Sequence, residues 1–245
     1  MRARTLILLA VLAFALTVAV RAPARWLLAT FPPSVQCVPD GTLWSGRCTP
    51  LTLAGITLSD VHWQLKPLQL LRGRFVAQLH SADPRAIADL QAAMRRDGSG
   101  ELTDLSAHVD IAAGLLPLFP EGWGGDLEAN LPHLSLSAGQ LTAVTGTITV
   151  RRVREQNPAL DLGSYELKFV DPGGGKDQSI GAVLRDLGGP LSVSGRLRLQ
   201  SNGEYELSGV AAARAGADDQ LASALQFLGA ADGRGRRPFT LSGKF

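Results

Sequence analysis

The sequence predicts a mainly β protein, in which an N-terminal transmembrane helix precedes a large twisted antiparallel β-sheet body with one or two short helices. Three observations support this fold class. An apolar run extends from Leu6 to Val20, interrupted only by Thr17. After it, short alternating or β-branched stretches recur between glycine, proline, asparagine and aspartate residues. These stretches lack the strand–helix alternation of a parallel sheet, so they are expected to form an antiparallel meander.

Residues 1–30 are expected to form a cytoplasmic tip and a transmembrane anchor. Arginines flank the apolar run on both sides: Arg2, Arg4, Arg21 and Arg25. A bilayer core of roughly 30 Å needs about 20 helical residues, a length that the segment reaches by continuing through Trp26 to Leu28. A cleaved signal peptide is the alternative, because the basic start, the short apolar core and Ala22-Pro-Ala24 also fit that pattern. Both interpretations export residues 31–245, and the anchor makes the chain a single-pass inner-membrane protein with a periplasmic body.

Net charge argues against a nucleic-acid partner. The chain has 24 basic and 22 acidic residues, a formal net charge of +2. Four of its arginines lie in residues 1–30, which contain no acidic residue, so the remainder has 20 basic against 22 acidic residues. The exported body therefore lacks the basic field that drives binding to nucleic acid.

The two cysteines, Cys37 and Cys48, lie eleven residues apart just after the apolar segment. In an oxidising compartment they are expected to form a disulfide, which on the chain-entropy model stabilises the fold by about 2.5–3 kcal/mol. Free thiols are the alternative. Metal binding fits poorly, because two thiols do not complete a tetrahedral site and no histidine is near them in sequence.

The body is expected to consist mostly of strands. Predicted strands cover residues 51–58, 60–65, 73–79, 131–137, 146–153, 165–170, 191–199, 204–210 and 239–245. In the second of these, Val61, Trp63 and Leu65 share one face. Asn202-Gly203 is the strongest hairpin signal in the chain, because both residues tolerate a positive φ.

Few helices are expected. Residues 218–228 form one, with Gly229 as its stop and its apolar positions on one face: Leu221, Leu225 and Leu228. Residues 85–96 are ambiguous. A helix is supported by the spacing of Ile87, Leu90 and Met94. A strand is supported by alternation in the same segment and by Asp97-Gly98, which offers a turn into 102–110.

No catalytic or cofactor-binding motif is found. The histidines are scattered without metal-ligand spacing: His62, His80, His108 and His133. No Gly-x-Ser-x-Gly nucleophile motif occurs. The glycine-rich segment 171–177 lacks the spacing of a phosphate-binding loop, and Asp177 replaces its hydroxyl residue. The sequence therefore predicts a protein that is not an enzyme and has no cofactor or metal.

A set of glycine, aromatic and other positions recurs in a distinctive order: Gly41, Leu43, Trp44, Gly46, Arg47, Val61, Trp63, Pro67, Leu71, Gly73, Gly163, Tyr165, Gly189, Pro190, Gly195, Gly203, Tyr205, Leu228, Gly229 and Gly243. In order and spacing this set resembles the protein N family of the type II secretion system, over nearly all of residues 41–245. The same positions also fit an ordinary sheet, with tryptophans on strand faces and glycines at turns or bulges. The cysteine pair is not part of the resemblance.

The resemblance implies a non-enzymatic accessory component of the machine that exports folded proteins across the outer membrane. It implies protein–protein contacts in the periplasm, with the periplasmic part of the secretin and with bitopic inner-membrane subunits as partners. Strand edges carry unpaired N–H and C=O groups, so strand addition is a natural mode of contact. Attachment to the membrane is expected through Leu6 to Val20.

The alternative function is a membrane-anchored β-groove protein that binds lipid or transfers it between membranes. A sheet that curls and leaves one face apolar and unpacked over many strands would favour this alternative. The alternation at Trp63, Ile148 and Leu197 is compatible with a filled core and with an open groove.

Overall fold

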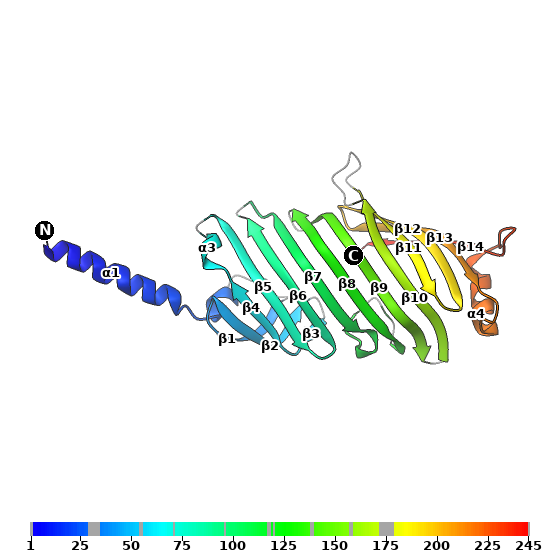
Figure 1. Ribbon diagram of the computed structural model, residues 1–245, viewed down its shortest axis with the longest axis horizontal. Helices are drawn as coiled ribbons and strands as arrows, with labels where there is room; N and C mark the ends of the chain where they lie inside the picture. Colours follow the sequence, from blue (N-terminus) through cyan, green and yellow to red (C-terminus); the bar gives the residue numbers. More distant parts are fainter. Residues whose placement is uncertain are drawn as a thin grey trace.

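The computed structural model describes residues 2–28, 35–53, 56–70, 72–95, 97–116, 119, 121–137, 140–156, 159–171 and 179–244. These residues form one antiparallel 14-stranded sheet, from one end of which a long helix extends (Figure 1). Neighbouring strands follow the chain order, β1-β2-β4-β5 and so on to β14, and β3 pairs with β2 off this path. The predicted antiparallel meander is confirmed.

The strands are β1 (Val35–Gly41), β2 (Ser45–Leu53), β3 (Ile56–Leu58), β4 (Val61–Leu65), β5 (Arg74–Asp83), β6 (Ala86–Arg95), β7 (Gly100–Asp110), β8 (Trp123–Ser137), β9 (Gln140–Gln156), β10 (Ala159–Asp171), β11 (Ser179–Gly188), β12 (Leu191–Gln200), β13 (Glu204–Ala213) and β14 (Arg237–Lys244). The helices are α1 (Arg2–Val20), α2 (Arg25–Leu28), α3 (Pro67–Leu70) and α4 (Asp219–Ala224), with 3-10 turns η1 (Ile111–Ala113) and η2 (Leu225–Leu228).

The ambiguous segment 85–96 is a strand. As β6 it pairs with β5 on one side and β7 on the other. Met94 lies opposite Phe75, and Leu90 lies opposite Leu79. Phe75 and Leu79 lie on one sheet face, so Met94 and Leu90 also share a face. The two-residue period of a strand, and not the helical period, therefore places these apolar side chains.

Local signals at the C-terminal end are confirmed. The Asn202-Gly203 hairpin joins β12 to β13, and the Gly203 N–H donates to the Gln200 carbonyl at 3.0 Å. The helix predicted at 218–228 is α4 continued by η2. The Asp218 side chain caps it by accepting from the Gln220 N–H, and Gly229 follows its last residue.

Four strand predictions are wrong in length. The stretch 51–58 is not one strand but the end of β2 and all of β3, paired as Leu51 opposite Leu58. The central strands are longer than predicted, with 15 residues in β8, 17 in β9 and 13 in β10. Pro132 interrupts the sequence pattern but not β8, because it lies at a register shift between Asn130 and His133.

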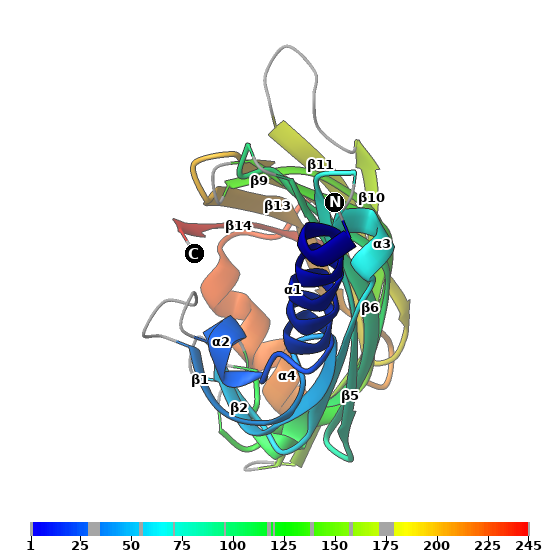
Figure 2. The ribbon, with the colours of Figure 1, turned by 90° about the vertical axis from the view of Figure 1, so that its left-hand side faces the viewer.

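The sheet curves so that one face, the inner face, lies on the concave side, where α4 also packs (Figure 2). Three apolar clusters follow one another along the inner face, centred on Trp63, on Ile180 and on Val193. The opposite, outer face carries most of the ion pairs, for example Arg151–Glu128 and Arg185–Glu166. Alternation along each strand therefore separates an apolar face from a charged one.

The helix α1 extends away from the sheet (Figure 1), and its apolar side chains are exposed, as for Phe14 at 71%. Among the residues that the structure describes, no helix combines the length and apolar character needed to cross a membrane. The transmembrane anchor stays a prediction. Leu71, Phe245 and most of the loop 171–177 lie outside the described residues.

Candidate functional site

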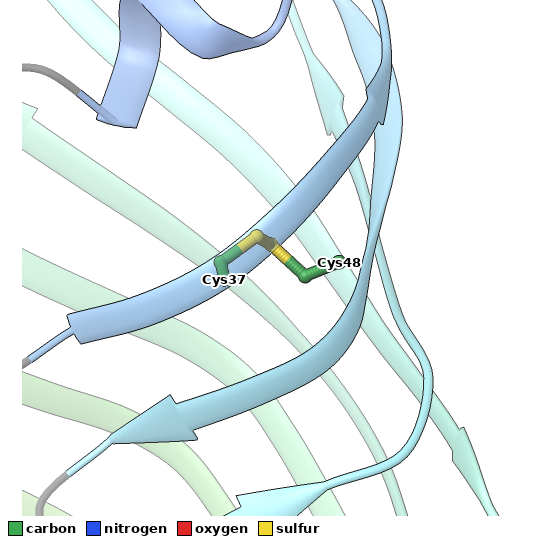
Figure 3. Close-up of a disulfide and its surroundings, with 2 residues drawn as sticks. All are labelled: Cys37 and Cys48. Atoms are coloured by element: carbon green, nitrogen blue, oxygen red, sulfur yellow. A yellow bond between two sulfur atoms is a disulfide. The ribbon is translucent and has the colours of Figure 1, made fainter.

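The predicted disulfide is present and joins β1 to β2 (Figure 3). Cys37 and Cys48 have Cα atoms 5.4 Å apart, and Cys48 is buried in the first apolar cluster. A register shift lies between Cys37 and Pro39 in the edge strand β1. The bond therefore fixes an irregular edge strand to its neighbour.

The first part of the motif set forms the joint between helix and sheet. The Trp44 indole N–H donates to the Ala19 carbonyl at the end of α1, at 2.7 Å. The Trp63 indole N–H donates to the Leu43 carbonyl at 3.2 Å. Gly46 lies opposite Trp63, and a Cβ on Gly46 would be 2.4 Å from the indole ring. Glycine is therefore needed here for the ring to cross the neighbouring strand.

The remaining motif residues of this half have structural positions. Val61, Trp63 and Leu65 are buried on the inner face, as predicted. Pro67 begins α3, and Gly73 lies in the turn before β5. Gly41 ends β1, where its carbonyl accepts from the Ala24 N–H at 3.2 Å, and Arg47 forms an exposed ion pair with Asp40 at 3.2 Å.

A second group of motif residues meets where β10 begins and β11 ends. A Cβ on Gly189 would be 2.5 Å from the Gly163 Cα. Arg214 donates to the carbonyls of Gly189 and Pro190 and forms an ion pair with Asp186. Burial acts to raise the pKa of Asp186, but the hydrogen bond and positive charge of Arg214, together with hydrogen bonds from Ser192 and the Val193 N–H, outweigh it, so the pKa is lowered.

Tyr165 belongs to this second group. Its hydroxyl donates to the Leu162 carbonyl, and its ring is part of the third apolar cluster. Burial, followed by the negative charges of Asp186 and Asp161, raises its pKa to about 12. As a neutral hydrogen-bond donor to the Leu162 carbonyl, the phenol stabilises this part of β10.

The last motif residues lie across β12, β13 and β14. Gly195 is opposite Gly209, and Tyr205 is opposite Gly243. Gly203 is in the hairpin turn, and Leu228 and Gly229 end η2, where the Gly229 carbonyl accepts from Arg237. The motif set is thus spread over the length of the sheet and does not converge on one centre.

The two sheet edges differ in how well they are protected. At β1 the disulfide, the register shift and Pro39 disturb the edge, and an isolated bridge between Pro23 and Thr42 covers one end. At β14 no described residue pairs with the outer edge. Proline has no N–H, so Pro238 takes an outward position, and by alternation Thr240 and Ser242 also direct N–H groups outward. The strand β14 is an open edge.

The outer face carries the four histidines, each beside a carboxylate. In the described part of the chain, no group of three or more His, Cys, Asp or Glu side chains is placed to hold a metal. Each histidine has one carboxylate neighbour within 4.0 Å: His62–Asp60, His80–Asp89, His108–Asp126 and His133–Glu101. Isolated acid–base pairs on an exposed sheet face are typical of a solvated surface.

Two features of the structure were not predicted from the sequence. One is the buried Asp83, which accepts hydrogen bonds from Ser59 and Arg85. Its only local signal is the Asp83-Pro-Arg85 sequence, which resembles a helix start. The other is an apolar cavity on the inner face, called the trough, which is lined by Ala24, by Val35 of β1 and by residues of β2 and β4–β8. Its lining includes the small residues Ala77, Ala92 and Gly100, which do not indicate a particular function in the sequence.

Fold and surface together define a class: a single-layer antiparallel β-sheet protein in which no described residue pairs with the outer edge of β14. Residues 38–240 match the family model described as type II secretion system (T2SS), protein N. The chain belongs to this family, and is thus a component of a type II secretion system.

Two curated relatives carry the same description. The type II secretion system protein N of Aeromonas hydrophila is 28% identical over 213 residues, covering 84% of this chain and 82% of that protein. The type II secretion system protein N of Pectobacterium carotovorum subsp. carotovorum is 25% identical over 243 residues, covering 96% and 94%. No solved structure gives a significant match.

Proposed function

We propose that this chain is a non-enzymatic accessory component of the type II secretion apparatus that acts through protein–protein contacts in the periplasm. The single observation that carries the proposal is the open edge of β14, at the opposite end of the sheet from α1. Membership of the family indicates the apparatus to which the protein belongs. The unpaired edge of β14 indicates how the protein would contact a partner. In this role the protein assists the export of folded proteins across the outer membrane.

Residues 1–30 are proposed to anchor the protein in the inner membrane, leaving 31–245 as the periplasmic domain. Support comes from α1, whose exposed apolar side chains include Leu8 at 69% and Phe14 at 71%. Apolar surface of this extent is unfavourable in water and favourable in a bilayer. The bond from Trp44 to Ala19 then holds the sheet at the end of the anchor.

Partner binding is proposed to occur by strand addition to β14. The proposed partners are the periplasmic part of the secretin and bitopic inner-membrane subunits. An added strand would bond to the outward N–H and C=O groups of Thr240 and Ser242, and side-chain contacts would select the partner. The exposed Leu241 (58%) lies on the inner face beside the same edge and offers apolar contact area.

A proline substitution tests this mode. Thr240→Pro removes one outward N–H and leaves the bonds of β14 to β13 in place, whereas Thr240→Val keeps the N–H and serves as the matched control. With a photo-reactive residue at Ser242 in intact envelopes, the wild-type and Thr240→Val proteins should capture secretion subunits. Thr240→Pro should capture markedly less. Capture that is equal in all three, or that yields no secretion subunit, would reject strand addition at β14.

A further inference from the structure

Two short helices lie at the end of the sheet from which α1 extends (Figure 1 and Figure 2). The helix α2 follows α1 after a turn, and α3 joins β4 to β5. Both expose large apolar side chains, since Trp26 is 54% exposed, Leu68 76% and Leu70 38%. The joint surface, as it is called here, consists of these three side chains and four exposed arginines: Arg21, Arg25, Arg72 and Arg74.

Hydrogen bonds around Trp44 hold both short helices next to the end of α1. The Trp44 indole N–H donates to the Ala19 carbonyl at 2.7 Å, and the Trp44 carbonyl accepts from the Leu65 N–H at 2.7 Å. Leu65 comes two residues before α3. The Leu43 N–H donates to the Ala22 carbonyl at 2.8 Å, three residues before α2. The segments that lead into α2 and α3 are therefore tied to one another and to α1.

The exposed leucines of α3 lie on a fixed turn. The Lys66 N–H donates to the Val76 carbonyl at 2.9 Å, and the Gly73 N–H donates to the Leu70 carbonyl at 3.0 Å. A single exposed leucine is common on protein surfaces and carries no information. Here exposed leucines and an exposed tryptophan occur together on the two helices beside α1, so this end of the sheet presents apolar groups outward.

The arginines of the joint surface lack acidic partners. No carboxylate of a described residue lies within 4.0 Å of any of the four. Elsewhere on the sheet Arg85, Arg152 and Arg214 each form an ion pair with an aspartate. Asp40, which precedes Gly41 at this end, is already paired with Arg47. The joint surface thus combines exposed apolar side chains with uncompensated positive charge.

The position of the joint surface selects lipid as its partner. The 19 residues of α1, at about 1.5 Å each, extend over about 28 Å, close to the roughly 30 Å of a bilayer core. With α1 across the membrane, the residues just after Val20 lie among the lipid headgroups. Tryptophan is enriched in this layer, and basic side chains there are attracted to anionic lipid. A polypeptide partner would have to compete with headgroups that α1 keeps beside this surface.

We propose that the joint surface docks on the headgroup layer of an anionic membrane, with Trp26, Leu68 and Leu70 inserted between lipids and the four arginines near lipid phosphates. The proposal rests on the anchoring role of α1 proposed above and adds a second contact beside it. This contact holds the sheet at a fixed inclination to the bilayer, where the turn between α1 and α2 alone would let it swing.

Photo-crosslinking to lipid tests the proposal. Full-length protein is reconstituted into vesicles of phosphatidylethanolamine and radiolabelled phosphatidylglycerol, with a photo-reactive phenylalanine analogue at one position. The positions are Phe14 in α1, Leu68 in α3 and, as the matched control, Phe227 in η2, which is 92% exposed at the other end of the sheet. Labelled lipid adducts are expected at positions 14 and 68, with little at 227.

The outcomes separate the docking surface from the anchor. An adduct at position 14 with none at 68, or equal adducts at 68 and 227, overturns the inference and leaves the anchor in place. Absence of the adduct at position 14 rejects the anchor, and this inference with it. In intact envelopes, protein adducts without lipid adducts at position 68 would also overturn the inference.

Charge variants test the preference for anionic lipid. Arg72→Gln with Arg74→Gln should lower the adduct at position 68 by about tenfold, because each basic side chain near an anionic surface strengthens attachment severalfold. Arg196→Gln with Arg198→Gln changes two exposed arginines at the same spacing on β12 and should leave the adduct unchanged. The adduct at position 14 reports correct insertion of each variant. An undiminished adduct at position 68 in the first variant, or an equal loss in the second, would overturn the assignment.

Discussion

Asp83 is a fully buried charged residue in the N-terminal half of the sheet. Its side chain is fully buried, and it accepts from the Ser59 N–H at 2.8 Å and from the Arg85 N–H at 2.9 Å. The Arg85 guanidinium, itself 46% exposed, also donates to it at 2.7 Å. The carboxylate thereby ties the β5–β6 turn to the segment that precedes β4.

Asp83→Ala should lower the free energy of unfolding by about 3 kcal/mol. The variant leaves two part-buried backbone N–H groups without an acceptor, and each hydrogen bond to a charged group contributes about 1.5–3 kcal/mol. Release from desolvation offsets part of this loss. The Arg85 side chain adds little, because water replaces its partner. Denaturant unfolding of the full-length protein in detergent, followed by circular dichroism, measures the change.

Acid provides a second test of the same carboxylate. Hydrogen bonding from Arg85, then from the Ser59 and Arg85 N–H groups, holds the pKa of Asp83 far below its usual range, although burial opposes this. A depressed folded-state pKa stabilises the protein above the unfolded-state pKa of about 3.9, and this stability is lost as the pH falls below that value. Asp83→Asn should flatten this part of the pH profile. Asp89→Asn, at an exposed pair with His80, is the control and should change stability by less than about 1 kcal/mol. A cost below about 1 kcal/mol for Asp83→Ala would refute the reasoning.

Three other outcomes are expected. Replacing Cys37 and Cys48 together by serine should lower the free energy of unfolding by about 2.5–3 kcal/mol, and a negligible change in denaturant midpoint would contradict the role given to the disulfide. Gly46→Ala should lower the free energy of unfolding by about 1–3 kcal/mol through the clash with the Trp63 indole ring. Gly233→Ala, whose added Cβ would meet nothing within 4 Å, should leave it unchanged, and thermal unfolding of both variants measures the difference. Tyr165→Phe should remove a phenol that ionises near pH 12 from the ultraviolet titration, and should reduce the stability lost as the pH rises from about 10 towards 12, since a raised folded-state pKa stabilises only below that window. Loss of a phenol that ionises near pH 10 instead would show that the ring is not buried.

Predictions that rested on local chemistry were confirmed. The Asn202-Gly203 turn, the helix capped by Asp218 and the disulfide all depend on residues close in sequence. Strand lengths in the centre did not follow from local chemistry. Pro132 and Gly146 look like strand ends, yet register shifts absorb them inside β8 and β9. Such shifts are defined by the neighbouring strand, which a single sequence does not display.

The candidate surfaces were less predictable for the same reason. Which edge stays open is a property of the whole pairing order, and β14 gives no sequence signal beyond Pro238. The trough arises because Ala77, Ala92 and Gly100 become neighbours only when three strands align. The motif residues were found from the sequence, but their positions show them to hold strands and turns together. The residues that resemble the family are therefore packing residues, and they do not belong to the proposed partner-binding edge.

In the single-layer sheet, the proposed membrane anchor and the proposed partner-binding edge at β14 lie at opposite ends. Twelve strand spacings lie between β1 and β14 in the hydrogen-bonded order, and at roughly 4.8 Å each they amount to about 58 Å along the curved sheet. Among the described residues none pairs with the distant edge at β14, while the edge next to α1 carries a disulfide, a proline and a register shift. A sheet that avoided pairing altogether would protect both edges. The asymmetry is what the proposed role requires: a membrane-anchored protein that presents one pairing edge deep in the periplasm and suppresses pairing at the membrane.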